Sequence, residues 1–439
     1  MRMVSGLAAA RKVLMEDRGL DLSSVPAEVM ERTAAALGRA MSPAEAVDEI
    51  LRRVREGGDE ALRGLARSLD GVETETFEVP KSEIASAYAE VSDELVRALE
   101  VAVRRCTRFH QASRPEGWID FSEGYGEMVV PVASVGAYVP RGLASTVLMT
   151  AIPARVAGVE DVIICTPPAS GGLPDPALLV AADLAGVNRV FHIGGAQAIA
   201  ALAYGTESVP KVDMVCGPGS VFVTLAKKAL FGEVGIEGLY GPTETAVIAD
   251  DTANATLCAA DLLAQAEHDV MATPVLITTS KQLADSVRRE LSVRVERLER
   301  AETARASLER RGVIAIVEDI DEALDLANEL APEHLSLMVR QPWRHVGRVR
   351  NAGALFLGEF SHEVLGDYVA GPSHVMPTAG TARFNSGISV RSFLKVMPVV
   401  GLDDETAASI SRAAAVIARA EGLTGHAEAA EIRDELTPS

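Results

Sequence analysis

The sequence predicts an α/β protein with two Rossmann-like parallel-sheet domains, a helical N-terminal segment and a C-terminal helical tail. The length of 439 residues is too great for one small core and indicates two or more α/β units. Apolar residues make up 48% of the chain but aromatic residues only 4%, a mixture that suits parallel sheets covered by helices. Short β-branched runs also alternate with Ala-rich helical stretches from about residue 128 onwards.

The N-terminal quarter is predicted to be mostly helical. Charged and apolar residues recur at helical spacing in residues 43–58 and 94–113. Pro43 suits the first turn of a helix, and the glycine pair at 57–58 suits its end. One strand is predicted in this part of the chain, at residues 74–80 (TETFEVP).

The middle of the chain carries the strand signals of two parallel sheets. Because helical stretches separate the runs, βαβ units are expected, and residues 128–245 and 246–360 each hold about one sheet's worth of strands. The predicted strands are residues 128–139, 162–166, 189–193, 213–216, 246–250, 274–278, 313–317 and 354–357.

Four regions follow from these patterns. A helical N-terminal segment is expected at residues 1–27, and a C-terminal tail at 389–439. Between them lie a discontinuous first Rossmann-like domain (28–137 and 246–388) and a second one (138–245). Within the tail, residues 403–420 are amphipathic, begin with acidic residues and end before a glycine, which predicts a helix.

The charge pattern argues against nucleic acid as a partner. The formal net charge is −20, whereas a protein that binds a duplex normally gathers Lys and Arg on one face. Here basic residues are interspersed with acidic ones, as in residues 288–311, which we interpret as one solvated helix.

A cytoplasmic protein is expected. The sequence has no run of 18 or more apolar residues, so no membrane span is predicted. The first nineteen residues lack the apolar core of a signal peptide. The cysteines, Cys106, Cys165, Cys216 and Cys258, are scattered and favour buried free thiols over a disulfide framework.

The segment DLLAQAEHD (261–269) offers two metal-binding side chains. It lies on a predicted helix that Asn254 could cap. Gln265 and His268 are three residues apart and would share one helix face, where an amide oxygen and an imidazole can ligate a metal. Taken alone, the segment is better explained as a helix end with a solvated polar face.

The segment APEHLSL (331–337) places a carboxylate beside an imidazole. Pro332 should end the preceding helix, so Glu333 and His334 are expected on a connection, where catalytic side chains often lie. Such a pair can supply a general acid and a general base, although Glu-His by itself is a common dipeptide.

Two further segments could supply ligands. Residues 361–384 are rich in Gly and Pro and predict a long loop that contains Asp367. Asp367 could bind a metal or instead satisfy backbone N–H groups in a turn. In EGLTGH (421–426), a Gly-containing turn could aim Glu421 and His426 at one point, or could be a helix end with an exposed histidine.

Two glycine-rich stretches, GGAQA (194–198) and GPGS (217–220), each follow a predicted strand. Backbone N–H groups there could approach a phosphate. Neither stretch has the G-x-G-x-x-G pattern, so the usual dinucleotide fingerprint is absent, and tight strand-to-helix turns explain them equally well.

Taken together, these stretches resemble the histidinol dehydrogenase family. The resemblance runs over roughly residues 30 to 435 in the family's order, and several segments in order make it specific. The matching segments are GGAQAIAALAYGTESVPKVD (194–213), DLLAQAEHD (261–269), APEHL (331–335), GDY (366–368) with HVMPT (374–378), and EGLTGH (421–426).

The resemblance implies an activity and a partner. Members of the family oxidise L-histidinol to L-histidine through histidinaldehyde, with one zinc ion per subunit and two NAD molecules consumed. It further implies a homodimer in which the tail, residues 389–439, reaches across to complete the partner's site. It also implies that the domain of residues 138–245 binds NAD.

The resemblance also assigns roles to individual residues. Glu333 and His334 would be the acid–base pair. The zinc ligands, which would also hold the substrate together with His334, would be Gln265, His268, Asp367 and His426. The other substrate contacts would be Thr243 and Glu421, and the cofactor contacts would be Tyr138, Gln197 and Ser220.

The sequence departs from the family pattern in three loops. PRGLASTVLM (140–149) is about three residues shorter, with Arg141 in place of a glycine. Ser220 replaces an Asn in GPGS, and YGPTE (240–244) replaces A-G-P-S-E. These changes leave two alternatives open. One is a paralogue that oxidises another alcohol, such as a sulfopropanediol whose sulfonate could pair with Arg141. The other is a non-catalytic metal-binding protein.

Overall fold

The structure is a computed structural model that describes residues 1–16, 19–20, 22–23, 25–169 and 172–436. It divides into two compact units. Unit 1 comprises Met1–Ser113 and Val132–Phe393, and unit 2 comprises Arg114–Pro131 and Leu394–Ser439. No helix of the described residues has the length and apolar character needed to cross a lipid bilayer.

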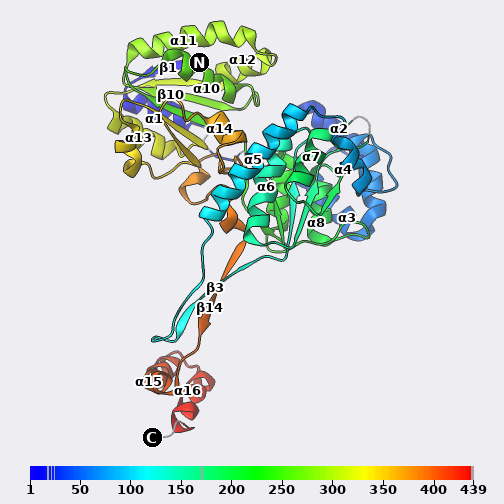
Figure 1. Cartoon of the computed structure of the whole chain (residues 1–439), viewed down its shortest axis with the longest axis vertical. Helices are drawn as coiled ribbons and strands as arrows, with labels where there is room; N and C mark the ends of the chain where they lie inside the picture. Colours follow the sequence, from blue (N-terminus) through cyan, green and yellow to red (C-terminus); the bar gives the residue numbers. More distant parts are fainter. Residues whose placement is uncertain (17–18, 21, 24, 170–171, 437–439) are drawn as a thin grey trace. The chain divides into compact units, whose positions relative to one another are not determined.

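Unit 1 contains a six-stranded parallel sheet, sheet A, with the order β1-β11-β10-β9-β12-β13. Helices cover both of its faces (Figure 1), because alternate residues of each strand enter one of two separate apolar cores. The strands are β1 (Arg2–Ser5), β9 (Glu244–Ala249), β10 (Thr273–Thr278), β11 (Val313–Ile316), β12 (His334–Met338) and β13 (Ala354–Leu357). Helices α10 (Ala255–Ala266), α11 (Lys281–Arg294) and α12 (Ala301–Arg310) share one core, and α1 (Leu7–Met15) and α13 (Ile320–Leu330) share the other.

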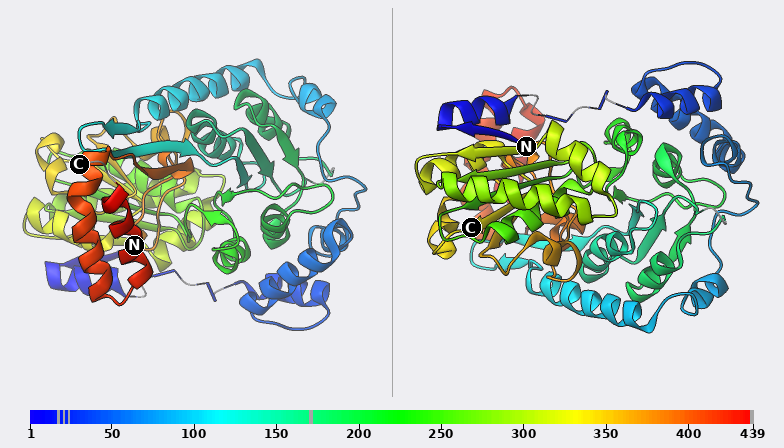
Figure 2. Two further views of the ribbon diagram at one scale, coloured as in Figure 1. Left: turned by 90° about the horizontal axis from the view of Figure 1, so that it is seen from below. Right: turned by 90° about the horizontal axis from the view of Figure 1, so that it is seen from above.

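Unit 1 also contains a five-stranded parallel sheet, sheet B, with the order β6-β5-β4-β7-β8. Figure 2 shows its helices from two further directions. The strands are β4 (Ser134–Tyr138), β5 (Asp161–Cys165), β6 (Arg189–Phe191), β7 (Met214–Cys216) and β8 (Gly235–Ile236). Helices α4 (Lys81–Ala87), α5 (Asp93–Ala112), α6 (Ala144–Ala157) and α7 (Pro176–Leu184) pack together, as do α2 (Ala27–Leu37), α3 (Pro43–Leu65), α8 (Gly195–Tyr204) and α9 (Val221–Leu230).

The two sheets share one topology. Numbered from β4, sheet B has the order 3-2-1-4-5; numbered from β9, sheet A has the same order with β1 added at its edge. This is the doubly wound Rossmann order, so the predicted pair of Rossmann-like sheets is confirmed. In each sheet the direction of winding reverses between the first and fourth strands, the usual place for a ligand crevice.

Short helices complete unit 1. The π-helix η1 (Ala66–Asp70) follows α3, and α14 (Glu363–Tyr368) follows β13. The 3₁₀ turns are η2 (Val295–Arg297), η3 (Pro342–Arg348), η4 (Thr381–Arg383) and η5 (Val390–Phe393).

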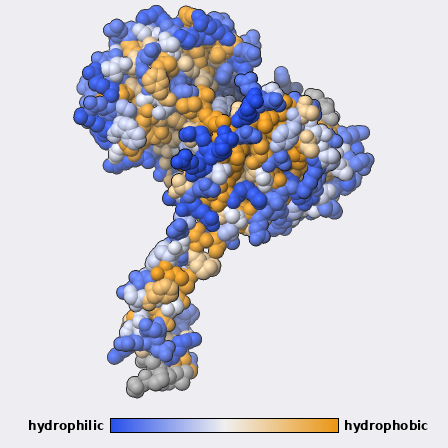
Figure 3. Space-filling view, in the orientation of Figure 1, coloured by the Kyte–Doolittle hydropathy of each residue, from blue (hydrophilic) through white to orange (hydrophobic). Residues whose placement is uncertain are grey.

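Unit 2 is small and exposes many apolar side chains. Strands β2 (Trp118–Asp120), β3 (Tyr125–Pro131) and β14 (Leu394–Val400) form an antiparallel sheet, and helices α15 (Asp404–Ala420) and α16 (Thr424–Leu436) pack against each other. Apolar residues show at its surface in Figure 3. Those exposed on the strands include Trp118, Tyr125, Met128, Val396, Met397 and Val400, Phe121 is exposed in the turn after β2, and those on the helices include Ile410, Val416, Ile417 and Ile432.

Several local predictions were wrong. Residues 128–139 are not one strand, because β3 and β4 belong to different units. The helix that was expected to end at the glycine pair continues as α3, and Gly58 absorbs a kink with φ of 49°. Residues 288–311 form two helices, α11 and α12, rather than one. Residues 74–80 contribute only an isolated bridge between Glu78 and Phe191.

The N-terminal part is distributed differently from the expected regions. Residues 1–27 contribute β1 and α1 to sheet A, so this segment is not purely helical. Helix α3, placed by the sequence in the first domain (28–137), instead packs against α8 and α9 of sheet B, because its apolar side chains enter that core. The predicted tail helix at 403–420 is present as α15, and all four cysteines are free and buried.

Candidate active site

A buried hydrogen-bond chain joins three of the predicted site residues at the amino ends of β9 and β12. Ala331 adopts a left-handed conformation after α13, with φ of 48°, and turns the chain towards β12. Glu333 Oε2 then accepts hydrogen bonds from Thr243 Oγ1 (2.5 Å) and from the Glu244 N–H (3.1 Å). Thr243 Oγ1 in turn accepts from Gln265 Nε2 (2.6 Å). Burial raises the pKa of Glu333 to about 7, so this carboxyl can exchange a proton near neutral pH.

His334 lies beside this chain, as the first residue of β12 rather than on the connection that the sequence predicted. Its Nδ1 is 3.2 Å from the carbonyl oxygen of Glu244, so the Nδ1–H tautomer donates there. Its Nε2 is 3.5 Å from Asp367 Oδ1 and makes no hydrogen bond within the described part of the chain. Burial alone would lower the pKa of His334, but the carboxylates of Glu333 and Asp367 outweigh it and raise that pKa.

The predicted metal ligands of unit 1 come from α10 and α14, which pack against each other. Gln265 is buried in the last turn of α10, whereas His268 lies two residues beyond the helix, so the expected shared helix face was wrong. Asp367 is on α14 and not in a loop. Burial opposes ionisation of Asp367, but His334, His374 and His268 lower its pKa, so these rings lie close enough to act on the carboxylate.

Two residues of this site have no role in the sequence prediction. His374 Nδ1 is 2.8 Å from the carbonyl oxygen of Asp367, and its Nε2 is 3.1 Å from Thr146 Oγ1. Glu363 is buried, and burial raises its pKa to about 8. Glu363 and Asp367 are four residues apart on α14, a spacing that places both on one helix face and could have revealed Glu363.

The remaining predicted ligands belong to unit 2. Glu421 is the C-cap of α15, and His426 lies in the first turn of α16; both are exposed. The segment after α15 forms a second helix, α16, so the tail is helical beyond residue 420 as well. In the described residues, no group of three or more His, Cys, Asp or Glu side chains is arranged to hold a metal ion.

The three predicted cofactor contacts lie at the carboxyl ends of the strands of sheet B. Tyr138 ends β4, and its hydroxyl oxygen accepts a hydrogen bond from the Gly195 N–H (3.2 Å) at the start of α8. Gln197 is buried on α8, and its Nε2 donates to Asp70 Oδ2 (3.1 Å). Ser220 is the N-cap residue of α9, in the loop that follows β7. Strands β4 and β7 adjoin at the reversal point of sheet B.

The helix N-termini distinguish the two sheets. In sheet A, the side chains of Asn254, Ser280 and Asp319 accept hydrogen bonds from the first turns of α10, α11 and α13. In sheet B, Asp175 caps α7, but the N-caps of α6, α8 and α9, which follow β4, β6 and β7, make no side-chain capping bond to any described residue. Uncapped N–H groups at a helix start can bind an anion such as a pyrophosphate. Sheet B is therefore the better equipped of the two for a dinucleotide.

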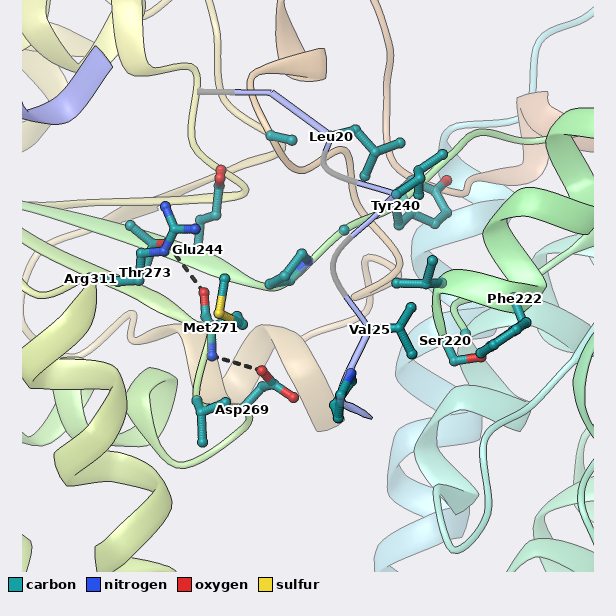
Figure 4. A pocket seen from close by; sticks show the side chains of 18 of the residues that line it. Leu20, Val25, Ser220, Phe222, Tyr240, Glu244, Asp269, Met271, Thr273 and Arg311 are labelled. Atoms are coloured by element: carbon teal, nitrogen blue, oxygen red, sulfur yellow. Dashed lines mark hydrogen bonds between the residues drawn. The ribbon is translucent and has the colours of Figure 1, made fainter. Parts of the chain in front are cut away.

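A cavity of about 820 Å³ adjoins the starts of α8 and α9. Figure 4 shows Ser220, Phe222 and Tyr240 on one side of it, and Asp269, Met271, Thr273 and Arg311 on the other. Gly195, Gln197 and Asp70 also line it. Its volume suits a cofactor-sized ligand.

Comparisons with known proteins agree with this architecture. A family model described as histidinol dehydrogenase matches residues 36–434. The chain is 48% identical to the histidinol dehydrogenase of Deinococcus radiodurans over 440 residues, which cover 99% of this chain and 100% of that one. It is 50% identical to the histidinol dehydrogenase of Thermus thermophilus over 395 residues, 89% of this chain and 94% of the relative. The crystal structure of histidinol dehydrogenase from Elizabethkingia anophelis superposes with a TM-score of 0.91 at 31% identity and covers 99% of this chain and 98% of that one. The chain therefore belongs to the histidinol dehydrogenase family.

Proposed function

We propose that this chain oxidises L-histidinol to L-histidine through histidinaldehyde, as a zinc-containing enzyme that reduces two NAD molecules per substrate. The observation that carries the proposal is the buried pair of Glu333 and His334, tied by Thr243 to Gln265. Family membership supports the substrate. A protein that only binds a metal does not need a buried acid–base pair of this kind.

His334 is the proton acceptor of the first oxidation. Its Nδ1–H is held by the Glu244 carbonyl, which leaves Nε2 as the basic nitrogen. Nearby carboxylates raise the pKa of His334, so they stabilise the imidazolium that forms when Nε2 takes the proton. It takes the hydroxyl proton of histidinol while the carbinol carbon loses hydride, and histidinaldehyde results.

Glu333 serves the second oxidation, in which water adds to the aldehyde. A carboxyl with a pKa of about 7 is half ionised near neutral pH and can take a proton from that water. His334 then accepts a proton again as the hydrated aldehyde loses hydride. Thr243 and the Glu244 N–H fix the carboxylate on Oε2, so its other oxygen is available for the water.

The zinc ligands we propose are Gln265, His268 and Asp367 of unit 1, with His426. An amide, a carboxylate and two imidazoles form a mixed nitrogen and oxygen set that suits zinc. Gln265 fits this role because its Nε2 is committed to Thr243, which leaves the amide oxygen as a ligand. When bound, zinc would hold the amine and imidazole of the substrate; Glu421, Thr243 and His334 would be the further substrate contacts.

NAD is proposed to bind sheet B through Tyr138, Gln197 and Ser220. The uncapped starts of α8 and α9 and the adjoining cavity support this assignment. When bound, NAD would accept the hydride in each oxidation. Asp70 holds the amide of Gln197 so that its oxygen is free to accept a hydrogen bond from the cofactor.

We further propose a cytoplasmic homodimer. The apolar residues exposed on unit 2 would be covered by a second copy, and the partner's tail would bring its own His426 and Glu421 to the site. Free, buried cysteines support a reducing compartment. The partner molecules are then a second chain and a small substrate.

The test is an assay of NADH formation with L-histidinol and, separately, with a sulfopropanediol. Each would be run on protein as purified, after removal of metal by a chelator, and after zinc is restored. The proposal requires turnover of histidinol that the chelator abolishes and zinc restores. Turnover of the sulfopropanediol alone would reject it. Arg141 does not favour that substrate, because its charge acts on Asp70 and Tyr138 on the cofactor side.

A further inference from the structure

A fully buried ion pair lies behind the cofactor loop of sheet B. Lys227 is on α9, and Glu237 follows β8. Their side chains are only 2% and 1% exposed, and Nζ lies 2.7 Å from Oε1. Neither residue has a part in the proposed chemistry.

The pair holds both backbone polar groups of one buried glycine. Gly217 is the first residue after β7, in the GPGS loop that ends at Ser220. Its N–H donates to Glu237 Oε1 (2.7 Å), and its carbonyl oxygen accepts from Lys227 Nζ (3.1 Å). Only glycine fits here, because φ is +107° and a Cβ atom would lie 2.1 Å from the Tyr138 carbonyl oxygen.

The same pair is connected to the catalytic strand. Lys227 Nζ lies 5.0 Å from the centre of the Tyr240 ring, a cation–π contact. Thr224, one turn earlier on α9, donates a hydrogen bond from its hydroxyl to the Tyr240 carbonyl oxygen (3.1 Å). Tyr240 lines the cavity, and Thr243, which binds Glu333, follows three residues later. Helix α9 thus fixes both the cofactor loop and the approach to β9.

Stability does not require an ion pair at this position. Removing two charges from water costs free energy that their mutual attraction repays only in part, so well-packed apolar side chains are often as stable. Here the charges do something that apolar side chains cannot, because they bind the N–H and C=O of Gly217. Such a device preorganises a loop for its ligand and reduces the entropy lost on binding.

We propose that Lys227 and Glu237 are positioning residues that set the GPGS loop, and with it Ser220 and the start of α9, for binding of the dinucleotide. This inference rests on the proposed function. The pair acts through the loop and not on the substrate. Loss of the pair frees Gly217, whereas the backbone of Tyr240 keeps its hydrogen bond to Thr224, so the effect falls on affinity for NAD and not on affinity for the alcohol.

The test replaces both charges at once, in K227M/E237M, so that neither is left buried and unpaired. The control is R189M/E78Q, which removes another ion pair (2.6 Å) of the sheet B half, where neither residue lines the cavity. Three quantities would be measured: the melting temperature, the Kd of NADH by fluorescence without substrate, and the KM values of NAD and histidinol. We expect a folded K227M/E237M protein with the Kd of NADH and the KM of NAD raised on the order of tenfold. Its KM for histidinol should be unchanged, and the control should bind NADH normally.

A folded K227M/E237M protein whose Kd for NADH stays within twofold of wild type would overturn the inference. If that variant does not fold, E237D serves instead. This substitution keeps the negative charge, but the shorter side chain cannot reach Lys227 and Gly217 together. It should therefore weaken NADH binding severalfold. Normal NADH binding by this variant would again overturn the inference. Failure of the proposed function gives a different result, since the wild-type protein itself would then fail to oxidise histidinol, whereas failure of this inference leaves the wild type active and the affinity of the variant for NADH normal.

Discussion

Glu333→Gln should separate the two oxidations. The amide has the shape of the carboxyl group, and its oxygen can still accept from Thr243 and the Glu244 N–H, so the fold and the metal ligands should survive. What is lost is a negative charge 3.9 Å from His334 Nδ1. At an effective dielectric constant of about 20, two charges at this distance interact by about 4 kcal/mol. The pKa of His334 should therefore fall by as much as about 3 units.

A lower pKa frees His334 to act as a base at neutral pH, so the first oxidation should stay within about tenfold of wild type. The second should slow by about 10²- to 10⁴-fold, because water loses its proton acceptor. The assay counts NADH per histidinol and traps histidinaldehyde with hydroxylamine. Glu329→Gln, the same change in the last turn of α13, is the matched control, since that exposed side chain pairs with Arg11 at the surface. Full release of histidine by Glu333→Gln would refute the role given to Glu333.

Three further predictions follow from other parts of the chain. His110 is fully buried, its ring nitrogens have no partner in the described residues, and burial lowers its pKa from 6.5 to about 4. As the pH falls, His110 therefore binds a proton in the unfolded chain before it does so in the folded one. The free energy of unfolding should decrease by about 2 kcal/mol between pH 7.5 and pH 5. Urea titrations of His110→Leu should not show this decrease. Asp70→Ala removes the acceptor that holds the amide of Gln197, which should raise the KM of NAD severalfold at a nearly constant kcat. Mixing inactive His334→Ala and His426→Ala chains under conditions that exchange subunits should restore about a quarter of the wild-type activity, whereas sites built from one chain alone would restore none.

Local sequence patterns were sufficient for the two parallel sheets. The β-branched runs between Ala-rich helices predict parallel strands, and the strand order confirms them. The strand of residues 334–338 was not predicted, because Pro332 suggested a longer connection after the preceding helix. Ala331 takes the left-handed turn, and β12 begins only two residues after the proline. His334 is consequently held by a strand, with its ring fixed against the neighbouring strand β9.

Packing over long sequence distances could not be predicted. Nothing near Thr146 in the sequence indicates that its hydroxyl contacts His374, 228 residues later. The same holds for Asp70 and Gln197, which meet only because α3 packs against α8. The buried Lys227–Glu237 pair could not be predicted either. In the sequence both residues look like ordinary surface charges, and only the packing of α9 over the loop after β7 brings them together.

The count of NADH per histidinol tests the central claim most directly. Limiting L-histidinol would be given to the zinc-loaded wild-type protein with excess NAD, and NADH and histidine would both be measured at completion. The buried acid–base pair predicts two NADH and one histidine for each histidinol. One NADH with accumulated histidinaldehyde, or no NADH at all, would contradict it.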